Sequence, residues 1–390
     1  KQIPDSRAIW KSTRRSPDGR SGRIESQAWS AAGLRTGRRG ARVGLVWRSR
    51  GIAVVLAIMA ARSICGIHFA DSGEILLSER SDGDGRQERT ESFRPFAWFR
   101  DAASAPHAEE LQGDQPFGHL AFFDTVDGLP SSRNRDEDAV VVRPIESQYL
   151  LAGGSRMFED MLFTDLRRCQ VDIETACEKA GGFPDPRRKG DRVLAIGIRA
   201  SGEAEPRLLE IEEETDQGER ALLRAFGKVL LELDPDVLEG HNIYSFDLDY
   251  LFRRSRRFRL EPLWGRFGLP AASRRSRLRV AERWIDFQRV DIPGRTVFDT
   301  FLAVQLFDVS TRDLPGYGLK DVAIHFGITP EDGSGRTYIE GSRIAEVFRE
   351  DRERFRAYLR DDLREQRAVS DLLLPTYFAQ ARNFPMPLQE

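Results

Sequence analysis

The sequence has little cysteine and few long apolar runs. Its cysteines, Cys65, Cys169 and Cys177, show neither CxxC spacing nor the Cys/His spacing of a zinc finger, so we predict neither a disulfide framework nor a zinc site. One apolar run, residues 52–61, is about half of the ~20 residues that a membrane span needs. We expect it to be buried or poorly ordered, with membrane association as the alternative. The predicted location is a reducing cytoplasm, at the nucleoid in a prokaryote, without a membrane.

Charge of one sign is not in excess either. The 390 residues contain 60 Lys and Arg against 62 Asp and Glu, which gives a formal net charge of −2. Global charge therefore gives no sign of nucleic-acid binding, and local clusters must supply any such signal. Hydrophobic residues make up 40% of the chain, which is enough for one large or two ordinary domains.

Residues 1–115 lack the periodicity of a helix or a strand. Arg, Ser, Gly and Asp dominate there, and such a composition buries too little apolar surface to offset the entropy lost on ordering. We predict a disordered extension, or one that is not a native part of the folded unit. Residues 116–164, with expected strands at 119–123 and 139–142, are predicted to form a small β-rich N-terminal module.

Residues 165–375 read as an α/β domain. Three expected strands with short connections favour an antiparallel meander, and a helix and a buried fourth strand follow. This order is typical of a ribonuclease-H-like mixed sheet flanked by helices, which is the predicted fold class. The expected strands are 168–174, 192–198, 208–211 and 237–242, and the expected helices are 218–232, 300–309, 317–326 and 351–374.

Three short elements of this domain carry carboxylates that could converge. Asp172 and Glu174 share one face of a strand, and Asp247 lies where a strand passes into a helix. Tyr358 and Asp362 share one face of a helix. Each element alone has an ordinary interpretation: an exposed strand edge, a helix cap or a charged helix face. Together, four carboxylates can hold two divalent cations, Mg²⁺ or Mn²⁺, for phosphodiester hydrolysis.

These elements resemble the motifs of the DEDD exonucleases, in the branch whose third motif carries Tyr. More narrowly, they are similar to the 3′→5′ exonuclease domain of family B DNA polymerases, over about residues 130–390. Segments 294–299 and 317–327 are also similar to the segments of this family that lie between its second and third motifs. The family pattern Asp-x-Glu, Asn-x-x-x-Phe-Asp and Tyr-x-x-x-Asp is matched here by Asp172, Glu174, Asn242, Phe246, Asp247, Tyr358 and Asp362.

The resemblance implies a role for each matched residue. Tyr358 is expected to position the hydrolytic water, and Asn242 and Phe246 to contact the terminal nucleotides of a single strand. A core role is the alternative for Phe246. Thr175 is expected to approach the 3′ end through its backbone. The implied ligands of the two cations are Asp172, Glu174, Asp247 and Asp362.

Two other polar residues lie close to these motifs in the sequence. Asp299 ends an expected strand, and we expect a structural role for it, with a ligand role as the alternative. His241 has apolar neighbours and is expected to be a core or turn residue.

An Arg-rich insert spans residues 253–295. Arg side chains with interleaved aromatic residues can track phosphates and stack on bases, so we expect Arg274 and Arg275 to bind nucleic acid. In the family a β-hairpin near this position helps to separate strands. The alternative interpretation is a solvated surface hairpin.

The predicted function is that of a metal-dependent, proofreading-type DNA exonuclease. The family's polymerase elements, Asp-x-x-Ser-Leu-Tyr-Pro and Thr-Asp-Ser, are absent, although residues 376–390 look like the start of a polymerase module. Either the chain is truncated, or the gene is split, or the nuclease acts alone. The expected partners are the 3′ end of single-stranded DNA and a polymerase module in the same or another chain. The alternatives are a standalone nuclease acting on RNA or repair intermediates, and a non-catalytic nucleic-acid-binding module.

Overall fold

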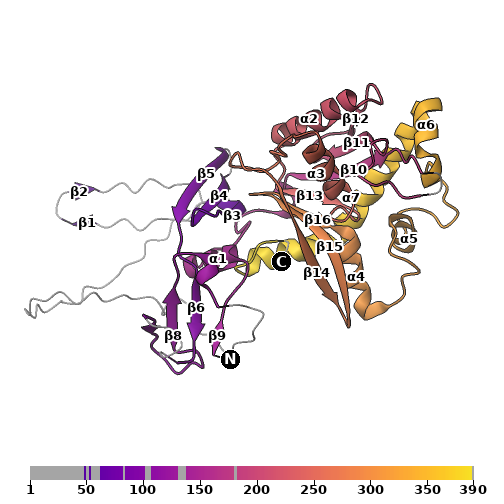
Figure 1. Cartoon of the computed structure of the whole chain (residues 1–390). Helices are drawn as coiled ribbons and strands as arrows, with labels where there is room; N and C mark the ends of the chain where they lie inside the picture. Colours follow the sequence, from indigo (N-terminus) through magenta and orange to yellow (C-terminus); the bar gives the residue numbers. More distant parts are fainter. Residues whose placement is uncertain are drawn as a thin grey trace, which may run out of the picture. The chain divides into compact units, whose positions relative to one another are not determined.

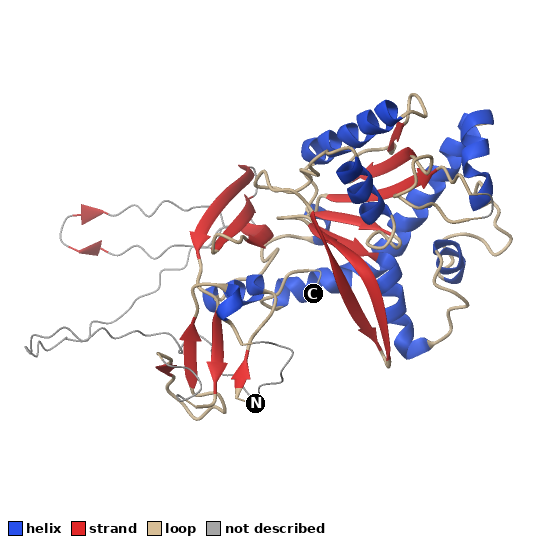
Figure 2. Ribbon diagram, viewed as in Figure 1, coloured by secondary structure: helices blue, strands red, loops and turns tan. Residues whose placement is uncertain are grey.

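The computed structural model describes residues 48–49, 52–53, 62–81, 84–101, 107–130, 138–179 and 182–388. All of them belong to one unit, residues 40–390. Its largest sheet has five strands in the order β12-β11-β10-β13-β16 (Figure 1). Helices pack against this sheet, as Figure 2 shows, and the predicted α/β fold class is confirmed.

The sheet combines a meander with parallel strands. β10, β11 and β12 are antiparallel neighbours, whereas β13 and β16 run parallel to β10 on its other side. β10 therefore lies in the middle of the sheet and pairs on both edges. The strands are β10 (Arg168–Thr175), β11 (Val193–Ala200), β12 (Arg207–Glu210), β13 (Val237–Gly240) and β16 (Thr296–Asp299).

Helix α2 (Asp216–Leu233) packs on β11 and β12 and buries Leu222, Leu223, Phe226 and Leu230. The Thr215 hydroxyl caps its first turn by accepting a hydrogen bond from the Gly218 amide at 3.1 Å. The predicted helix at 218–232 is confirmed. The sequence alone could predict it because its apolar residues recur at helical spacing.

Helix α7 (Arg352–Asn383) packs on β10, β11 and β13. Gly197 on β11 makes this approach possible. A Cβ atom at Gly197 would lie 2.8 Å from Leu363 Cδ1 and 3.0 Å from Leu359 Cδ1, closer than side chains tolerate. Gly197 is the cross-strand partner of Asp172, so the helix comes close to the sheet beside that carboxylate.

The remaining elements after β13 agree with the expected order. The Arg-rich insert continues helix α3 and then forms a hairpin of β14 and β15. The hairpin contacts α3 and α4. The elements are α3 (Asp247–Arg257), β14 (Ala272–Val280), β15 (Arg283–Asp291), α4 (Thr300–Thr311), α5 (Leu319–His325), η5 (Gly341–Arg343) and α6 (Ile344–Glu350).

The last helix is longer than predicted. Its expected end at residue 374 is wrong, because α7 continues through Pro375 to Asn383. Proline removes one backbone donor, but buried Phe378 and Ala381 hold the following turns against the core. Leu388 lies in the same core. Residues 376–388 therefore pack onto the same unit as the preceding helices.

The prediction of an unstructured extension over residues 1–115 is wrong for residues 63–99. Strands β3, β4 and β5 form one sheet there, and β6 belongs to a second, in the order β7-β8-β6-β9. Ile75 and Leu77 are fully buried in a core completed by distant residues such as Phe298 and Phe378, so local periodicity gave no sign of it. The elements are β1 (Arg48–Ser49), β2 (Ile52–Ala53), β3 (Ser63–Phe69), β4 (Glu74–Ser81), β5 (Asp84–Ser92), β6 (Phe96–Phe99), β7 (Glu109–Glu110), β8 (His119–Phe122), η3 (Val126–Gly128), β9 (Ala139–Val140), α1 (Ile145–Gly153) and η4 (Phe163–Asp165).

Parts of the first 61 residues stay untested. The predicted disorder of residues 1–47 and most of the apolar run 52–61 lie outside the described residues. Within the described part of the chain, no helix is long and apolar enough to span a membrane.

Buried ion pairs join the N-terminal strands to the central domain. Arg80 on β4 donates two hydrogen bonds, of 2.8 and 2.9 Å, to the carboxylate of Asp236, which is fully buried before β13. Arg266 donates to the same carboxylate at 2.9 Å and to Asp234 at 2.9 Å. Arg86 on β5 also reaches Asp234, at 2.7 Å. Asp234 also pairs with Arg295, at 2.8 Å, so these two acidic side chains join arginines from distant parts of the sequence.

We expect Asp236→Asn to destabilise the protein by about 3 kcal/mol, because it leaves Arg80 and buried Arg266 without a full counter-charge. Asp234 still pairs with Arg266, which keeps the loss at the lower end of the usual range. Arg86→Ala is the matched control and is expected to cost less than about 1 kcal/mol, since its side chain is partly exposed. Urea unfolding midpoints measure both values, and equal losses would contradict the assigned role of Asp236.

Candidate active site

The middle strand β10 presents two acids on one face. Asp172 and Glu174 are two residues apart, so both side chains project from the same side of the sheet. This is the side on which α7 lies, because Gln366 of α7 donates to Asp172 Oδ1 at 2.6 Å. Both acids are half-buried at the C-terminal end of the strand.

Helix α3 supplies a third acid at its first residue. Asp247 is 2% exposed, and its Oδ1 accepts a hydrogen bond of 3.0 Å from the Ile173 amide. Ile173 lies between Asp172 and Glu174, so this contact ties the start of α3 to the strand that carries both acids. Asp247 has the setting that the sequence predicted, where the chain passes from β13 into α3.

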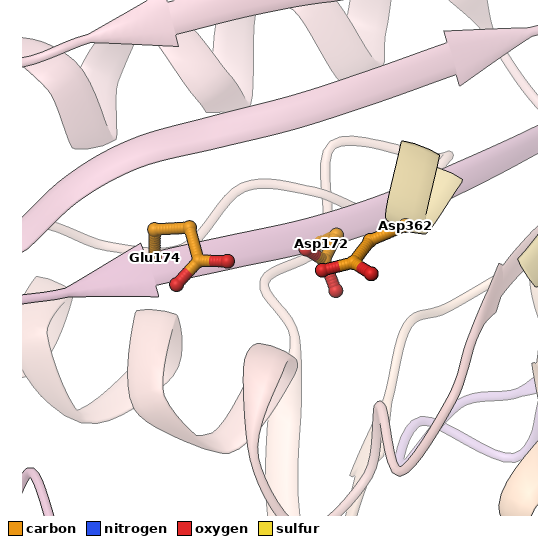
Figure 3. Close-up of side chains that lie close together, drawn as sticks. All are labelled: Asp172, Glu174 and Asp362. Carbon is orange, nitrogen blue, oxygen red and sulfur yellow. The ribbon is translucent and has the colours of Figure 1, made fainter. Parts of the chain in front are cut away.

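Helix α7 supplies the fourth acid. Carboxylate oxygens of Asp172, Glu174 and Asp362 all lie within 4.8 Å of one another. Figure 3 shows the side chains of Asp172 and Asp362 beside each other, with Glu174 further along the strand. Tyr358 lies one helical turn before Asp362 and is 8% exposed.

A cavity of about 480 Å³ opens over these residues. Its walls come from β10, from the segment between β13 and α3, and from helices α5 and α7. Seven of the residues predicted from the three motifs line this one cavity: Asp172, Glu174, Asn242, Phe246, Asp247, Tyr358 and Asp362.

The acids make one another harder to ionise. Burial first, and then the neighbouring carboxylates, raise the pKa values of Asp172 and Glu174 well above their usual range. Burial raises the pKa of Asp247 to about 7, although amide hydrogen bonds oppose this rise. Burial also raises the pKa of Asp362 to about 6, against the opposing charges of Arg336 and Lys320. This electrostatic situation favours a positively charged ligand.

Asp299 holds the backbone of the second motif in place. Its Oδ1 accepts the amides of Asn242 and Phe301, both at 2.9 Å, and its Oδ2 accepts the Tyr244 amide at 3.2 Å. Asn242 has φ of +67°, a conformation that few residues other than glycine adopt readily. Asp299 therefore positions the segment that carries Asn242 and Phe246, in agreement with the structural role expected for it.

Three predicted residues lie outside the cavity wall. Thr175 ends β10 at an irregularity in its pairing with β11. Arg274 pairs with Asp291 at 2.5 Å at the base of the hairpin. Arg275 is its neighbour on β14, so it projects from the opposite face of the hairpin and is exposed. The structure thus separates two arginines that the sequence had grouped.

The sequence reasoning missed several residues near the acids. Gln366 follows Asp362 by four residues, so helical spacing could have found it. His241 was expected to be a core or turn residue but lines the cavity, where burial lowers its pKa to about 4. Its Nε2 lies 2.7 Å from the Tyr317 carbonyl oxygen. Arg336 comes from an irregular segment and had no periodic signal, whereas Lys320 lies in a segment that stood out only through the family resemblance.

A family model matches residues 153–322 and describes the exonuclease domain of DNA polymerase family B. The match contains the strand with Asp172 and Glu174 and the helix start with Asp247. It ends before Tyr358 and Asp362, so the third motif is supported by the geometry of α7 instead.

Curated relatives are similar over part of their length. The DNA polymerase delta catalytic subunit of Dictyostelium discoideum is 29% identical over 244 residues, which are 57% of this chain and 21% of that protein. The corresponding subunit of Mesocricetus auratus is 34% identical over 180 residues, 41% of this chain and 16% of that one. DNA polymerase 2 of Aeropyrum pernix is 27% identical over 247 residues, 59% of this chain and 26% of that one. The chain thus spans about a quarter or less of these relatives.

A solved structure shares the fold. The family B DNA polymerase of Pyrobaculum calidifontis superposes with a TM-score of 0.65 at 20% identity, covering 84% of this chain and 48% of that one. The family-model match, the relatives and the shared fold all relate this chain to DNA polymerases of family B. Residues 153–322 therefore match the exonuclease domain of DNA polymerase family B.

Proposed function

We propose that this protein is a divalent-metal-dependent 3′→5′ exonuclease that removes nucleotides from single-stranded DNA ends. The observation that carries the proposal is the convergence of acids from β10, α3 and α7 on one cavity. Since the relatives that it resembles are DNA polymerases, we further propose that it acts with a polymerase module as a proofreading activity.

The residues present fit a pair of Mg²⁺ or Mn²⁺ ions. Carboxylate oxygens are the donors that these hard cations prefer, and the acids here raise one another's pKa in a way that a cation would relieve. Asp172, Glu174 and Asp362 would hold them, together with Asp247. Two bound cations would supply an activated water and charge stabilisation for phosphodiester cleavage.

The chain's own side chains have separate tasks in this proposal. The Tyr358 hydroxyl orients the attacking water, and burial raises its pKa so that it stays protonated and can donate. Phe246 and Asn242 line the same cavity, which supports a role for both in contacting the last nucleotides of the strand. Lys320 also lines it, where it offsets part of the negative charge.

The proposal predicts that Asp172→Asn with Glu174→Gln lowers excision at least about 100-fold, because loss of a residue that merely supports a metal ligand already costs about 10–100-fold. The measurement uses a 5′-labelled single-stranded DNA oligonucleotide with Mg²⁺ or Mn²⁺. The parent protein should give a ladder that shortens from the 3′ end. Both substitutions preserve side-chain size, so circular dichroism should show an unchanged fold.

Two controls define what would refute this assignment. An RNA oligonucleotide of the same sequence tests the sugar preference, and faster cleavage of RNA would favour a standalone ribonuclease. A ladder that the double variant produces at the parent rate would remove the acids from catalysis.

We expect Glu174→Gln to raise the Tm at pH 8 in the presence of EDTA. The pKa of Glu174 is raised in the folded state, so the parent loses stability as the pH rises from the ordinary carboxyl pKa to the raised folded value, whereas glutamine cannot ionise. The difference should shrink towards pH 5, where the parent carboxyl is increasingly protonated. Each kcal/mol corresponds to roughly 2–4 °C for a domain of this size. Differential scanning fluorimetry measures the effect, and a lower Tm for the variant at pH 8 would contradict it.

The hairpin gives a prediction with an internal control. Arg275 and Arg277 lie on its outer face, and the Arg277 guanidinium stacks 4.5 Å from the Trp284 ring centre. If this face binds the DNA backbone, Arg275→Ala with Arg277→Ala should flatten the slope of log K against log salt by about 0.7 for each phosphate that is no longer neutralised. Arg274→Ala should leave the slope unchanged, since Arg274 pairs with Asp291. Fluorescence anisotropy distinguishes these cases, and equal effects would exclude a specific role for the outer face.

A further inference from the structure

Arg336 bridges two acids of helix α7. Its Nη2 donates to Asp362 Oδ1, and its Nη1 lies 2.8 Å from Glu365 Oε2. The Arg336 side chain is 5% exposed, and its guanidinium carbon lies 5.8 Å from the Tyr358 ring centre. The Arg336 guanidinium therefore contacts both Asp362, a proposed metal ligand, and Glu365, which does not line the cavity.

The carboxylate of Glu365 accounts for the presence of an arginine at position 336. It is fully buried, and its other oxygen accepts the Thr329 hydroxyl at 2.5 Å. A carboxylate removed from water needs a counter-charge, and Arg336 supplies it. Once Arg336 is anchored on Glu365, its second amino group reaches Asp362. The contact with Glu365 thus holds a positive charge beside the proposed cation site.

Arg336 belongs to the segment of residues 329–338, which joins α5 to η5 without regular structure. Beside the bonds of Thr329 and Arg336, the contacts of this segment with α7 include the Thr337 amide, which donates to Asp361 Oδ2 at 2.8 Å, and the Tyr338 carbonyl oxygen, which accepts from Arg354 at 3.0 Å. Gly333 and Gly335, with φ of +68° and +76°, allow its turns. Arg336 is thus part of what seats the segment on α7.

A divalent cation and Arg336 would use the same carboxylate. Both are positive, and both draw on the limited number of lone pairs of Asp362 within a poorly solvated cluster. By thermodynamic reciprocity, if Arg336 weakens cation binding, a bound cation weakens the hold of Arg336 by the same factor. The contact of Arg336 with Glu365 remains available in either case.

We propose that Arg336 is a positioning residue that competes with a divalent cation for Asp362 and thereby couples cation binding to the seating of residues 329–338 on α7. The inference rests on the proposed function in one respect, the assignment of Asp362 as a metal ligand. It adds a regulatory role for a segment outside the three motifs: Arg336 sets the cation concentration at which the site fills.

The test measures Mn²⁺ affinity of the full chain by calorimetry without DNA. The variant Arg336→Met with Glu365→Gln removes the pair without leaving one buried charge alone, and it should bind Mn²⁺ at least about fivefold more tightly than the parent. Arg336→Lys retains the positive charge and should stay near the parent value. The control Arg343→Met with Glu346→Gln removes an exposed ion pair of 2.5 Å that does not involve residues 329–338 and should also leave the affinity unchanged.

Unchanged or weaker binding by the Arg336/Glu365 variant would overturn the competition. If the parent shows no saturable Mn²⁺ binding that Asp172→Asn weakens, the metal site itself is wrong and the proposed function fails with it. If only this inference is wrong, the parent still binds Mn²⁺, and the Arg336/Glu365 variant binds it no more tightly than the parent.

Hydrogen exchange of the parent protein provides a readout that needs no variant. Mn²⁺ should accelerate amide exchange within residues 333–338, since it weakens the Arg336 anchor. The Arg336/Glu365 variant should exchange rapidly there both with and without Mn²⁺. Exchange in the parent segment that does not respond to saturating Mn²⁺ would overturn the coupling.

Discussion

Like charges held together away from water are the constraint on which the rest of this molecule depends. Carboxylate oxygens of Asp172, Glu174 and Asp362 lie within 4.8 Å of one another, and burial and repulsion both disfavour their ionised forms. Flexible side chains would move apart. Here the acids are attached to a middle strand paired on both edges and to a helix that approaches the sheet closely over Gly197. Rigid elements therefore hold an arrangement that electrostatics opposes.

Compensation of this charge comes from several directions. Gln366 donates to Asp172 from α7, and the Ile173 amide donates to Asp247 from the strand itself. Lys320 and Arg336 bring positive charge from α5 and from the irregular segment that follows it. These groups offset only part of the cost of ionising the acids, since burial, and for Asp172 and Glu174 also repulsion, keeps the pKa values raised. A site that is incompletely neutralised by its own protein is suited to bind cations reversibly.

Much of the site could be predicted because its residues follow the side-chain periodicity of the strand or helix that carries them. Alternation along a strand places Asp172 with Glu174, and helical spacing places Tyr358 with Asp362, whatever surrounds them. Arg336 lies in an irregular segment without such periodicity. Its position depends on the contact with buried Glu365 and on the path of that segment, so the sequence did not predict it. The N-terminal strands escaped prediction for a related reason, since their apolar residues complete a core whose other half lies hundreds of residues away. Those contacts become visible only in three dimensions.

The third motif shows how the fold completes what sequence similarity leaves open. The family match ends at residue 322, whereas Asp362 lies forty residues further on, beyond an irregular connection. Its position follows from α7, whose Leu359 and Leu363 pack over Gly197, the cross-strand partner of Asp172. Asp362 lies between these leucines in the sequence and Gln366 one turn beyond it, so a helix packed in this way necessarily brings both close to Asp172. Hydrophobic packing against the sheet thus places the acid of the third motif, and it holds that charge where electrostatics alone would not have put it.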